Sequence, residues 1–82
     1  MRNKITVVGS GYVGMANAVA LSKKNPVIIL DIDSERVKLI MDNKSPIQDA
    51  LIDQYLKEDN LELVASTDSQ SAYRYSDYVF IA

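Results

Sequence analysis

The stretch "ITVVGSGYVGM", residues 5–15, contains all three glycines of this 82-residue chain, at Gly9, Gly11 and Gly14. Their spacing is G-x-G-x-x-G, and it follows the short apolar run Ile5–Val8, which predicts a buried strand. The residues after it, 12–24, have the pattern of a helix. A glycine-rich turn between a buried strand and a helix is typical of a dinucleotide-binding fold.

Each glycine has a separate role in this interpretation. Gly9 permits the tight turn from strand to helix, Gly11 allows a pyrophosphate to approach the backbone, and Gly14 allows the helix to pack against the sheet. We expect the amides at the helix start, together with the positive end of the helix dipole, to hold the phosphates without a lysine. The alternative is a tight turn that merely requires glycine.

An acidic residue follows the second predicted strand, Val27–Leu30. Asp31 lies 22 residues after Gly9, close to the roughly 20 expected for a carboxylate that binds the adenosine ribose. Such a carboxylate accepts hydrogen bonds from the ribose hydroxyls and repels a 2′-phosphate, which favours NAD over NADP. The alternative for Asp31 is a loop aspartate that solvates the strand end. Asp33 is a rival for the same role, but we expect it to act at the start of the next helix.

Arg36 lies in the first turn of a helix that we expect Ser34 to cap. A cation there opposes the helix dipole, so the position is unfavourable for helix stability. The placement therefore suggests a contact with the adenosine ribose or phosphate. A solvated surface arginine is the equal alternative.

The second half of the chain predicts two more helices and two more strands. "SPIQ", residues 45–48, has the form of a capping box, in which the Ser45 side chain accepts from the Gln48 amide. The helix that follows is expected to run to about Glu58. The helix carries Ile47, Leu51 and Tyr55 at four-residue spacing. The remaining elements are an edge strand at 61–65, where Glu62 interrupts the apolar run, a short helix at 69–75 and a buried strand at 78–82. Packing roles are expected for Tyr55, Tyr73, Tyr75 and Tyr78, and a solvated helix face for Asp49, Asp53, Glu58 and Asp59.

Apolar runs that alternate with helical patterns predict an α/β fold, here a Rossmann-type doubly wound parallel sheet that is truncated after about four strands. In a sheet of order 3-2-1-4-5-6, a fifth strand covers the fourth. We therefore expect residues 1–82 to be the N-terminal part of a dinucleotide-binding domain in a larger protein. An isolated copy would expose an adhesive sheet edge at residues 78–82.

Composition restricts the other functional classes. The net charge is −2, and the chain contains no cysteine and no histidine. These counts exclude a disulfide framework and a cysteine-based metal site, and they argue against zinc. Dispersed basic residues argue against a nucleic-acid partner. No stretch approaches the roughly 20 apolar residues of a membrane span, and a cytoplasmic location is the default expectation.

Four segments, "GSGYVGM", "ILDIDSERV", "SPIQD" and "SDYVFIA", resemble in order the N-terminal part of the UDP-glucose/GDP-mannose dehydrogenase family. The resemblance covers essentially the whole chain, and the combination with "SPIQD" is most similar to the UDP-glucose branch. It implies the NAD-binding part of an enzyme that oxidises UDP-glucose to UDP-glucuronate in two NAD-dependent steps, through an enzyme-bound aldehyde and a cysteine thioester. The alternatives are a relative acting on GDP-mannose or a UDP-N-acetylhexosamine, or a non-catalytic nucleotide-sensing module.

Carried over by position, the resemblance implies a set of cofactor-binding residues and no catalytic or metal-binding residue. The catalytic cysteine, its lysine and acid partners and the UDP-sugar pocket are expected beyond residue 82, so the chain alone is not expected to be active. The segment Ser45 to Asp49 corresponds to a family segment at the cofactor side of the interdomain cleft. A UDP-sugar substrate and a homodimeric full-length protein are also implied. The implied cofactor-binding residues are Gly9, Ser10, Gly11, Tyr12, Val13, Gly14, Asp31 and Arg36.

Overall fold

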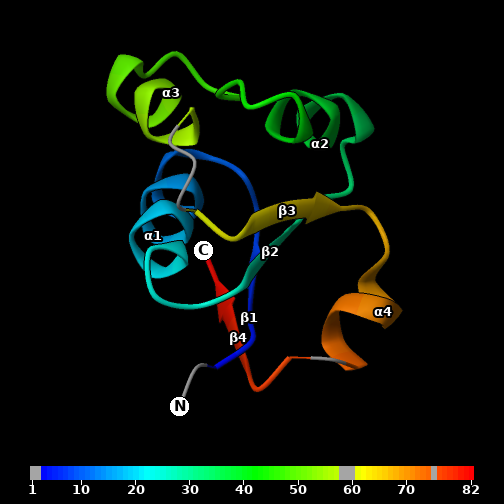
Figure 1. Ribbon diagram of the computed structural model, residues 1–82. Coiled ribbons are helices and arrows are strands. Elements are labelled where there is room, and N and C mark those ends of the chain that lie inside the picture. Colours follow the sequence, from blue (N-terminus) through cyan, green and yellow to red (C-terminus); the bar gives the residue numbers. More distant parts are fainter. Residues whose placement is uncertain (1–2, 58–60, 75) are drawn as a thin grey trace.

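A four-stranded parallel sheet lies between helices in the computed structural model, which describes residues 3–57, 61–74 and 76–82 (Figure 1). The strand order is β3-β2-β1-β4, and every neighbouring pair is parallel. This order confirms the predicted α/β, Rossmann-type sheet and the edge position of the third strand. The strands are β1 (Ile5–Val8), β2 (Val27–Leu30), β3 (Leu63–Ser66) and β4 (Tyr78–Ile81).

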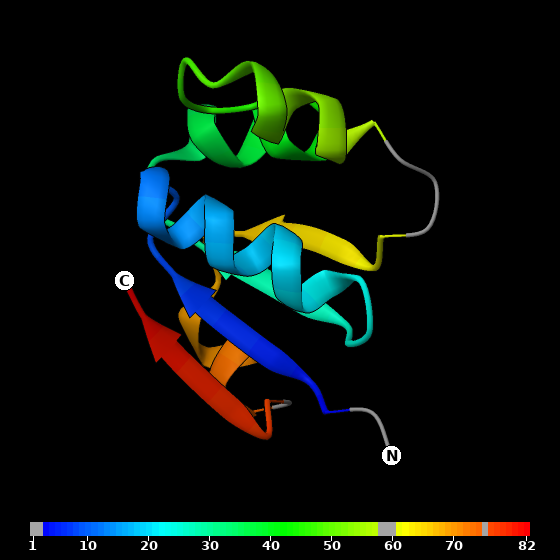
Figure 2. The same cartoon turned by 90° about the vertical axis from the view of Figure 1, so that its left-hand side faces the viewer.

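Helices cover both faces of the sheet, as the doubly wound arrangement requires. Figure 1 shows α1 on one side of the strands and α4 on the other, and Figure 2 shows α2 and α3 stacked beyond α1 and β3. Within this layer α3 packs against α1, and α2 packs against β3. The helices are α1 (Tyr12–Ser22), α2 (Ser34–Met41), α3 (Ala50–Leu56) and α4 (Ser69–Arg74).

The core lies between the two central strands and α1. Val7 on β1, Ile29 on β2 and Met15 on α1 are each fully buried. Because β1 and β2 have a strand on either side and helices on both faces, they need apolar residues at successive positions rather than at alternate ones. The predicted strands Ile5–Val8 and Val27–Leu30 are therefore confirmed with the bounds that the apolar runs gave.

An aspartate, and not a serine, caps α2. The Asp33 side chain accepts hydrogen bonds from the amides of Glu35, at 2.9 Å, and Arg36, at 3.4 Å. The expectation that Ser34 is the N-cap is wrong by one residue, while the expected helix-start role of Asp33 is confirmed. Both residue types cap well, so local sequence alone does not choose between neighbours.

The capping box expected at residues 45–48 is not formed. Ser45 instead closes a local turn, in which its hydroxyl accepts from the Ile47 amide at 3.2 Å and donates to the Ile47 carbonyl at 2.7 Å. Asp49 is the N-cap, and its side chain accepts from the Leu51 and Ile52 amides at 3.0 Å each. The helix thus begins four residues later than the serine–proline pair suggested.

The buried side of α3 does not follow the apolar residues at four-residue spacing. Ile52 and Leu56 are buried, whereas Leu51 is 56% exposed. Tyr55 does pack at the border of the core, with the Lys23 ammonium 4.7 Å from its ring centroid. The expected helix end at Glu58 lies outside the described residues, as do the placements of Asp59 and Tyr75.

All four residues of β4 are exposed, so the prediction of a buried fourth strand is wrong for this chain. The strand lies at the end of the sheet and pairs with β1. The expected exposure of this edge is confirmed. Tyr78 is 61% and Tyr73 48% exposed, which corrects the expectation that both are packing residues.

Candidate functional site

The turn after β1 needs a glycine at its first position for a backbone reason. Gly9 has φ +100°, a conformation that residues with a side chain rarely adopt. Its amide still donates to the Leu30 carbonyl at 2.8 Å, which extends the β1–β2 ladder by one bond before the chain turns. The predicted role of Gly9 in the tight strand-to-helix turn is confirmed by this geometry.

The third glycine allows α1 to approach the turn closely. A Cβ on Gly14 would lie 2.1 Å from the Gly9 carbonyl oxygen and 3.4 Å from the Ala82 Cβ. No side chain fits at the first of these distances. The predicted close packing of Gly14 is therefore confirmed, although the surface that it meets is mainly the turn after β1.

Gly11 is different, because the protein itself does not require a glycine there. Its φ of −74° and ψ of −170° are open to any residue, and a Cβ would meet nothing within 4 Å. Gly11 is the N-cap of α1, and the first helical hydrogen bond runs from the Met15 amide to its carbonyl at 2.9 Å. The preceding amides of Tyr12, Val13 and Gly14 have no acceptor within the helix. The open space beside Gly11, at the start of this helix, fits an anionic group such as a pyrophosphate.

The Asp31 carboxylate is held beside this loop by Ser10. Oδ2 of Asp31 accepts from the Ser10 amide at 3.0 Å and from the Ser10 hydroxyl at 2.5 Å, and Oδ1 accepts from the Asp33 amide at 2.9 Å. Burial raises the pKa of Asp31, but the hydrogen bonds from Ser10 and Asp33 and the charge of Arg36 together hold the pKa below its ordinary value. The side chain is thus a fixed carboxylate at the carboxyl end of β2.

Arg36 reaches back from α2 to the same loop. Its Nη1 donates to the Ser10 carbonyl at 3.1 Å and to the Ser10 hydroxyl oxygen at 3.4 Å, and its Nε lies 3.8 Å from Asp33 Oδ2. The interpretation of Arg36 as a solvated surface arginine is incomplete, because its guanidinium donates to Ser10 in the glycine-rich loop. The side chain remains 38% exposed, so its outer nitrogens are accessible to a ligand.

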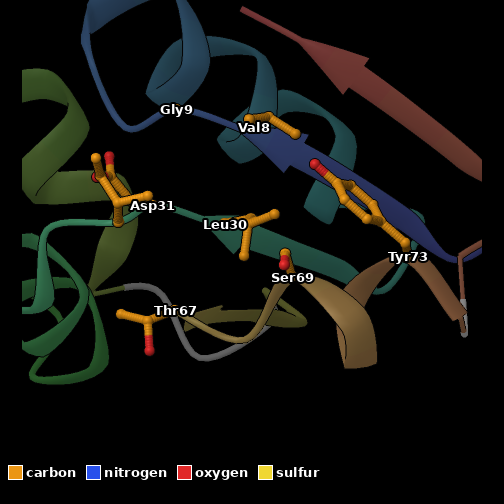
Figure 3. A pocket seen from close by; sticks show the side chains of 8 residues that line it. Val8, Gly9, Leu30, Asp31, Thr67, Ser69 and Tyr73 are labelled. Carbon is orange, nitrogen blue, oxygen red and sulfur yellow. The ribbon is translucent and has the colours of Figure 1, made fainter.

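A pocket of about 300 Å³ lies next to Asp31, at the carboxyl ends of β1 and β2. Figure 3 shows Asp31 and Tyr73 at its opposite ends, with Leu30 and Ser69 between them. Apolar walls together with the Asp31 carboxylate at one end suit a flat aromatic base attached to a ribose. The lining residues are Val8, Gly9, Leu30, Asp31, Ile32, Thr67, Ser69 and Tyr73.

The predicted residues of the glycine-rich loop lie together with Asp31 and Arg36 at the carboxyl ends of the strands. Six lining residues were not among the predicted site residues: Val8 and Leu30 at the strand ends, and Ile32, Thr67, Ser69 and Tyr73. Ile32 offered a signal, since it is an apolar residue between two aspartates and is 98% exposed. Thr67, Ser69 and Tyr73 come from the segment after β3, and only the parallel order of the strands places that segment here.

Among residues 3–57, 61–74 and 76–82, no three acidic side chains come together in a way that could hold a metal ion. Within the same ranges, no helix has both the length and the apolar character needed to cross a membrane.

Comparison with known proteins places these features in a defined context. Residues 3–82 match the family described as "UDP-glucose/GDP-mannose dehydrogenase family, NAD binding domain". A UDP-glucose 6-dehydrogenase from Campylobacter jejuni is 42% identical over 81 residues, which is 96% of this chain and 21% of that protein. A UDP-glucose 6-dehydrogenase from Streptococcus pneumoniae is also 42% identical, over 79 residues, 96% of this chain and 20% of that protein. The chain thus spans about a fifth of the length of these curated relatives.

A solved structure agrees with the sequence relatives. A ternary complex of GDP-mannose dehydrogenase from Pseudomonas aeruginosa superposes with a TM-score of 0.88 at 35% identity, covering 100% of this chain and 19% of that chain. A UDP-glucose dehydrogenase from Pyrobaculum islandicum has a TM-score of 0.87 at 22% identity, covering 100% of this chain and 20% of that chain, and supports the fold alone.

Proposed function

The chain belongs to the UDP-glucose/GDP-mannose dehydrogenase family, and we propose that it is the NAD-binding part of a dehydrogenase that oxidises UDP-glucose to UDP-glucuronate. Residues 3–82 match the NAD-binding domain of that family. The observation that carries the proposal is the succession of three features: the open helix start at Gly11, the carboxylate of Asp31 and the pocket next to Asp31. A pyrophosphate, a ribose and an adenine need these three features in this order.

The proposed contacts follow the chemistry of each group. The first-turn amides of α1, those of Tyr12, Val13 and Gly14, would bind the pyrophosphate beside Gly11, and Asp31 would accept from the ribose hydroxyls. Arg36 would face the adenosine side, and the pocket beyond Asp31 would receive the adenine. When bound, NAD supplies the hydride acceptor for oxidation of an alcohol. The chain's own residues bind and orient it.

UDP-glucose is proposed as the substrate because two UDP-glucose 6-dehydrogenases that match 96% of this chain are 42% identical to it. Two alternatives come from the same family. A GDP-mannose dehydrogenase is 35% identical, and a UDP-N-acetyl-D-mannosamine dehydrogenase from Methanococcus aeolicus is 54% identical over 43 residues, 51% of this chain and 10% of that protein.

The proposal also concerns the protein as a whole. Residues 1–82 would act as the N-terminal part of the NAD-binding domain, with the catalytic and UDP-sugar-binding parts supplied by other residues, since the relatives are about five times longer. The proposal includes a homodimer of the complete protein, because the resemblance to this family implies one. A cytoplasmic location is included because NAD and nucleotide sugars are cytoplasmic metabolites.

The test is NADH formation by the complete natural protein that carries this chain, given NAD and a panel of UDP- and GDP-sugars. Formation of NADH with UDP-glucose, at two NADH per sugar, is the expected result. Turnover with a different sugar would keep the cofactor and the reaction class but replace the substrate. Binding of NAD without turnover of any sugar would favour a non-catalytic nucleotide-sensing module.

A further inference from the structure

We propose that Ser10 is a positioning residue for cofactor selection, whose buried hydroxyl holds Asp31 and Arg36 in the arrangement that favours NAD over NADP. This inference rests on the proposed function and gives Ser10, which the resemblance implies only as a cofactor-binding residue, a side-chain role that acts through Asp31 and Arg36. Ser10 occupies the first variable position of G-x-G-x-x-G. The glycine pattern requires nothing of its side chain.

The hydroxyl of Ser10 joins three segments that are distant in sequence. It donates to Asp31 Oδ2 at 2.5 Å, and its oxygen lies 3.4 Å from the Arg36 Nη1, which also donates to the Ser10 carbonyl at 3.1 Å. A hydroxyl can donate once and accept as well, so both contacts form together. The loop after β1, the end of β2 and the first turn of α2 are thereby fixed to one atom.

Burial makes this arrangement rigid. Ser10 is only 1% exposed, so water has little access to its hydroxyl, and hydrogen bonds to charged groups are among the stronger ones. The contrast is Ser22, which is also buried, at 2% exposed, but whose hydroxyl donates to Val19 within its own helix. Ser22 contributes to local helix structure, whereas Ser10 connects the cofactor-facing groups.

The fixed carboxylate keeps capacity for a ligand. A carboxylate has about four acceptor positions, and the amide and hydroxyl of Ser10 and the amide of Asp33 occupy three of them. The hydrogen bonds already made fix the direction of the remaining acceptor position. A ribose hydroxyl therefore meets an acceptor whose orientation is set before binding, which lowers the entropy lost on binding. Without the Ser10 hydroxyl, the carboxylate keeps its charge but loses this constraint.

The experiment measures Kd for NAD and NADP by calorimetry on the complete natural protein, comparing Ser10→Ala with the matched control Ser22→Ala. Loss of a hydrogen bond to a charged group predicts roughly three- to tenfold weaker NAD binding for Ser10→Ala. NADP binding should change much less, because the repelling charge of Asp31 remains. The NAD preference should fall by a similar factor. Ser22→Ala should bind both cofactors as the wild type does.

A double-mutant cycle with Asp31→Asn identifies the route of the effect. If Ser10 acts through Asp31, Ser10→Ala should change the NAD affinity by less than about twofold in the Asp31→Asn background. Should Ser10→Ala fail to fold, Ser10→Cys takes its place, because a thiol keeps the volume but bonds weakly. An unchanged cofactor preference, or an equal loss with and without Asp31, would overturn the inference. A wild-type protein that binds neither cofactor would overturn the proposed function and this inference with it.

Discussion

Gly14 lies so close to Gly9 that a Cβ on Gly14 would be 2.1 Å from the Gly9 carbonyl oxygen. The contact joins the first turn of α1 to the end of β1 across the glycine-rich loop. Both partners are backbone at this point, so neither can rotate away as a side chain could. The close approach is therefore a condition of the fold, separate from any ligand.

Gly14→Ala should destabilise the fold through this contact. Insertion of a methyl group into a tightly packed site costs about 1–3 kcal/mol, and the lack of a flexible partner favours the upper part of that range. Urea unfolding followed by circular dichroism measures the loss. Gly11→Ala is the control, since its Cβ would meet nothing within 4 Å. Equal stability of Gly14→Ala and the wild type would contradict the packing seen here.

Gly11→Val should have the opposite profile, with the fold retained and NAD binding lost. The backbone at Gly11 is extended, which a β-branched residue accepts readily. Valine is a poorer N-cap than glycine, so the stability should fall, but by no more than about 1 kcal/mol. The side chain would fill the space in front of the α1 amides, and NAD affinity should fall by more than about tenfold, or 1.4 kcal/mol. Calorimetric titration with NAD measures the affinity. Normal NAD binding by a folded Gly11→Val variant would remove the pyrophosphate from this position.

The order and type of most elements could be predicted from the sequence because they depend on local pattern. The apolar runs at Ile5–Val8 and Val27–Leu30 are strands with those bounds, and the polar Glu62 correctly indicated an edge strand near it. The start of α3 could not be predicted in the same way. Ser45 and Asp49 both have capping side chains, and the Ser45 amide donates to the Asp53 carboxylate at 3.0 Å, a contact that holds the segment before α3 outside the helix.

The candidate site was predictable in its parts but not in its connections. The glycine spacing and the position of Asp31 predict a phosphate-binding loop and a ribose-binding carboxylate, and the structure places Asp31 in contact with that loop. The link through Ser10 was not predictable, because Asp31 and Arg36 lie 21 and 26 residues away from it. Such a contact depends on how the ends of β1 and β2 are placed side by side. Tertiary packing, and not a motif, therefore decides it.

Asp31→Asn should weaken NAD binding and relax the discrimination against NADP. The amide keeps the shape of the side chain but has one acceptor oxygen in place of two and no charge to repel a 2′-phosphate. Kd values for both cofactors should therefore converge, with NAD weakened by roughly tenfold. Fluorescence titrations with NADH and NADPH measure both affinities. Unchanged Kd values for both cofactors would exclude Asp31 from the site.

Asp31 should also make the stability of the fold depend on pH in the acid range. Burial raises its pKa, but the bonds from Ser10 and Asp33 and the charge of Arg36 leave the pKa below the ordinary value of 3.8. A lowered pKa in the folded state means that the carboxylate stabilises the fold above the ordinary pKa, and that this contribution is lost as pH falls through the lowered pKa. The difference in urea midpoint between wild type and Asp31→Asn should be constant from about pH 7 to 5 and shrink below about pH 4. A difference that does not vary with pH would contradict the assignment.

The isolated 82-residue chain should self-associate through β4. Its four residues are all exposed and mostly apolar, and a sheet edge with free backbone groups readily pairs with another strand. Sedimentation velocity over a range of concentrations should show assembly that increases with concentration. Ile81→Lys, at a position 78% exposed, should shift the chain toward monomer, because a charge on an edge strand opposes pairing.

A second apolar surface makes a matched control possible. Leu51 on α3 is 56% exposed. It lines a groove between α1 and α3 together with Tyr12 and Tyr55. Leu51→Lys adds the same charge away from the sheet edge and should leave the association unchanged. If Leu51→Lys produced the monomer and Ile81→Lys did not, the association would involve the α1–α3 surface. A wild-type chain that remains monomeric at every concentration would mean that the exposed edge of β4 does not pair.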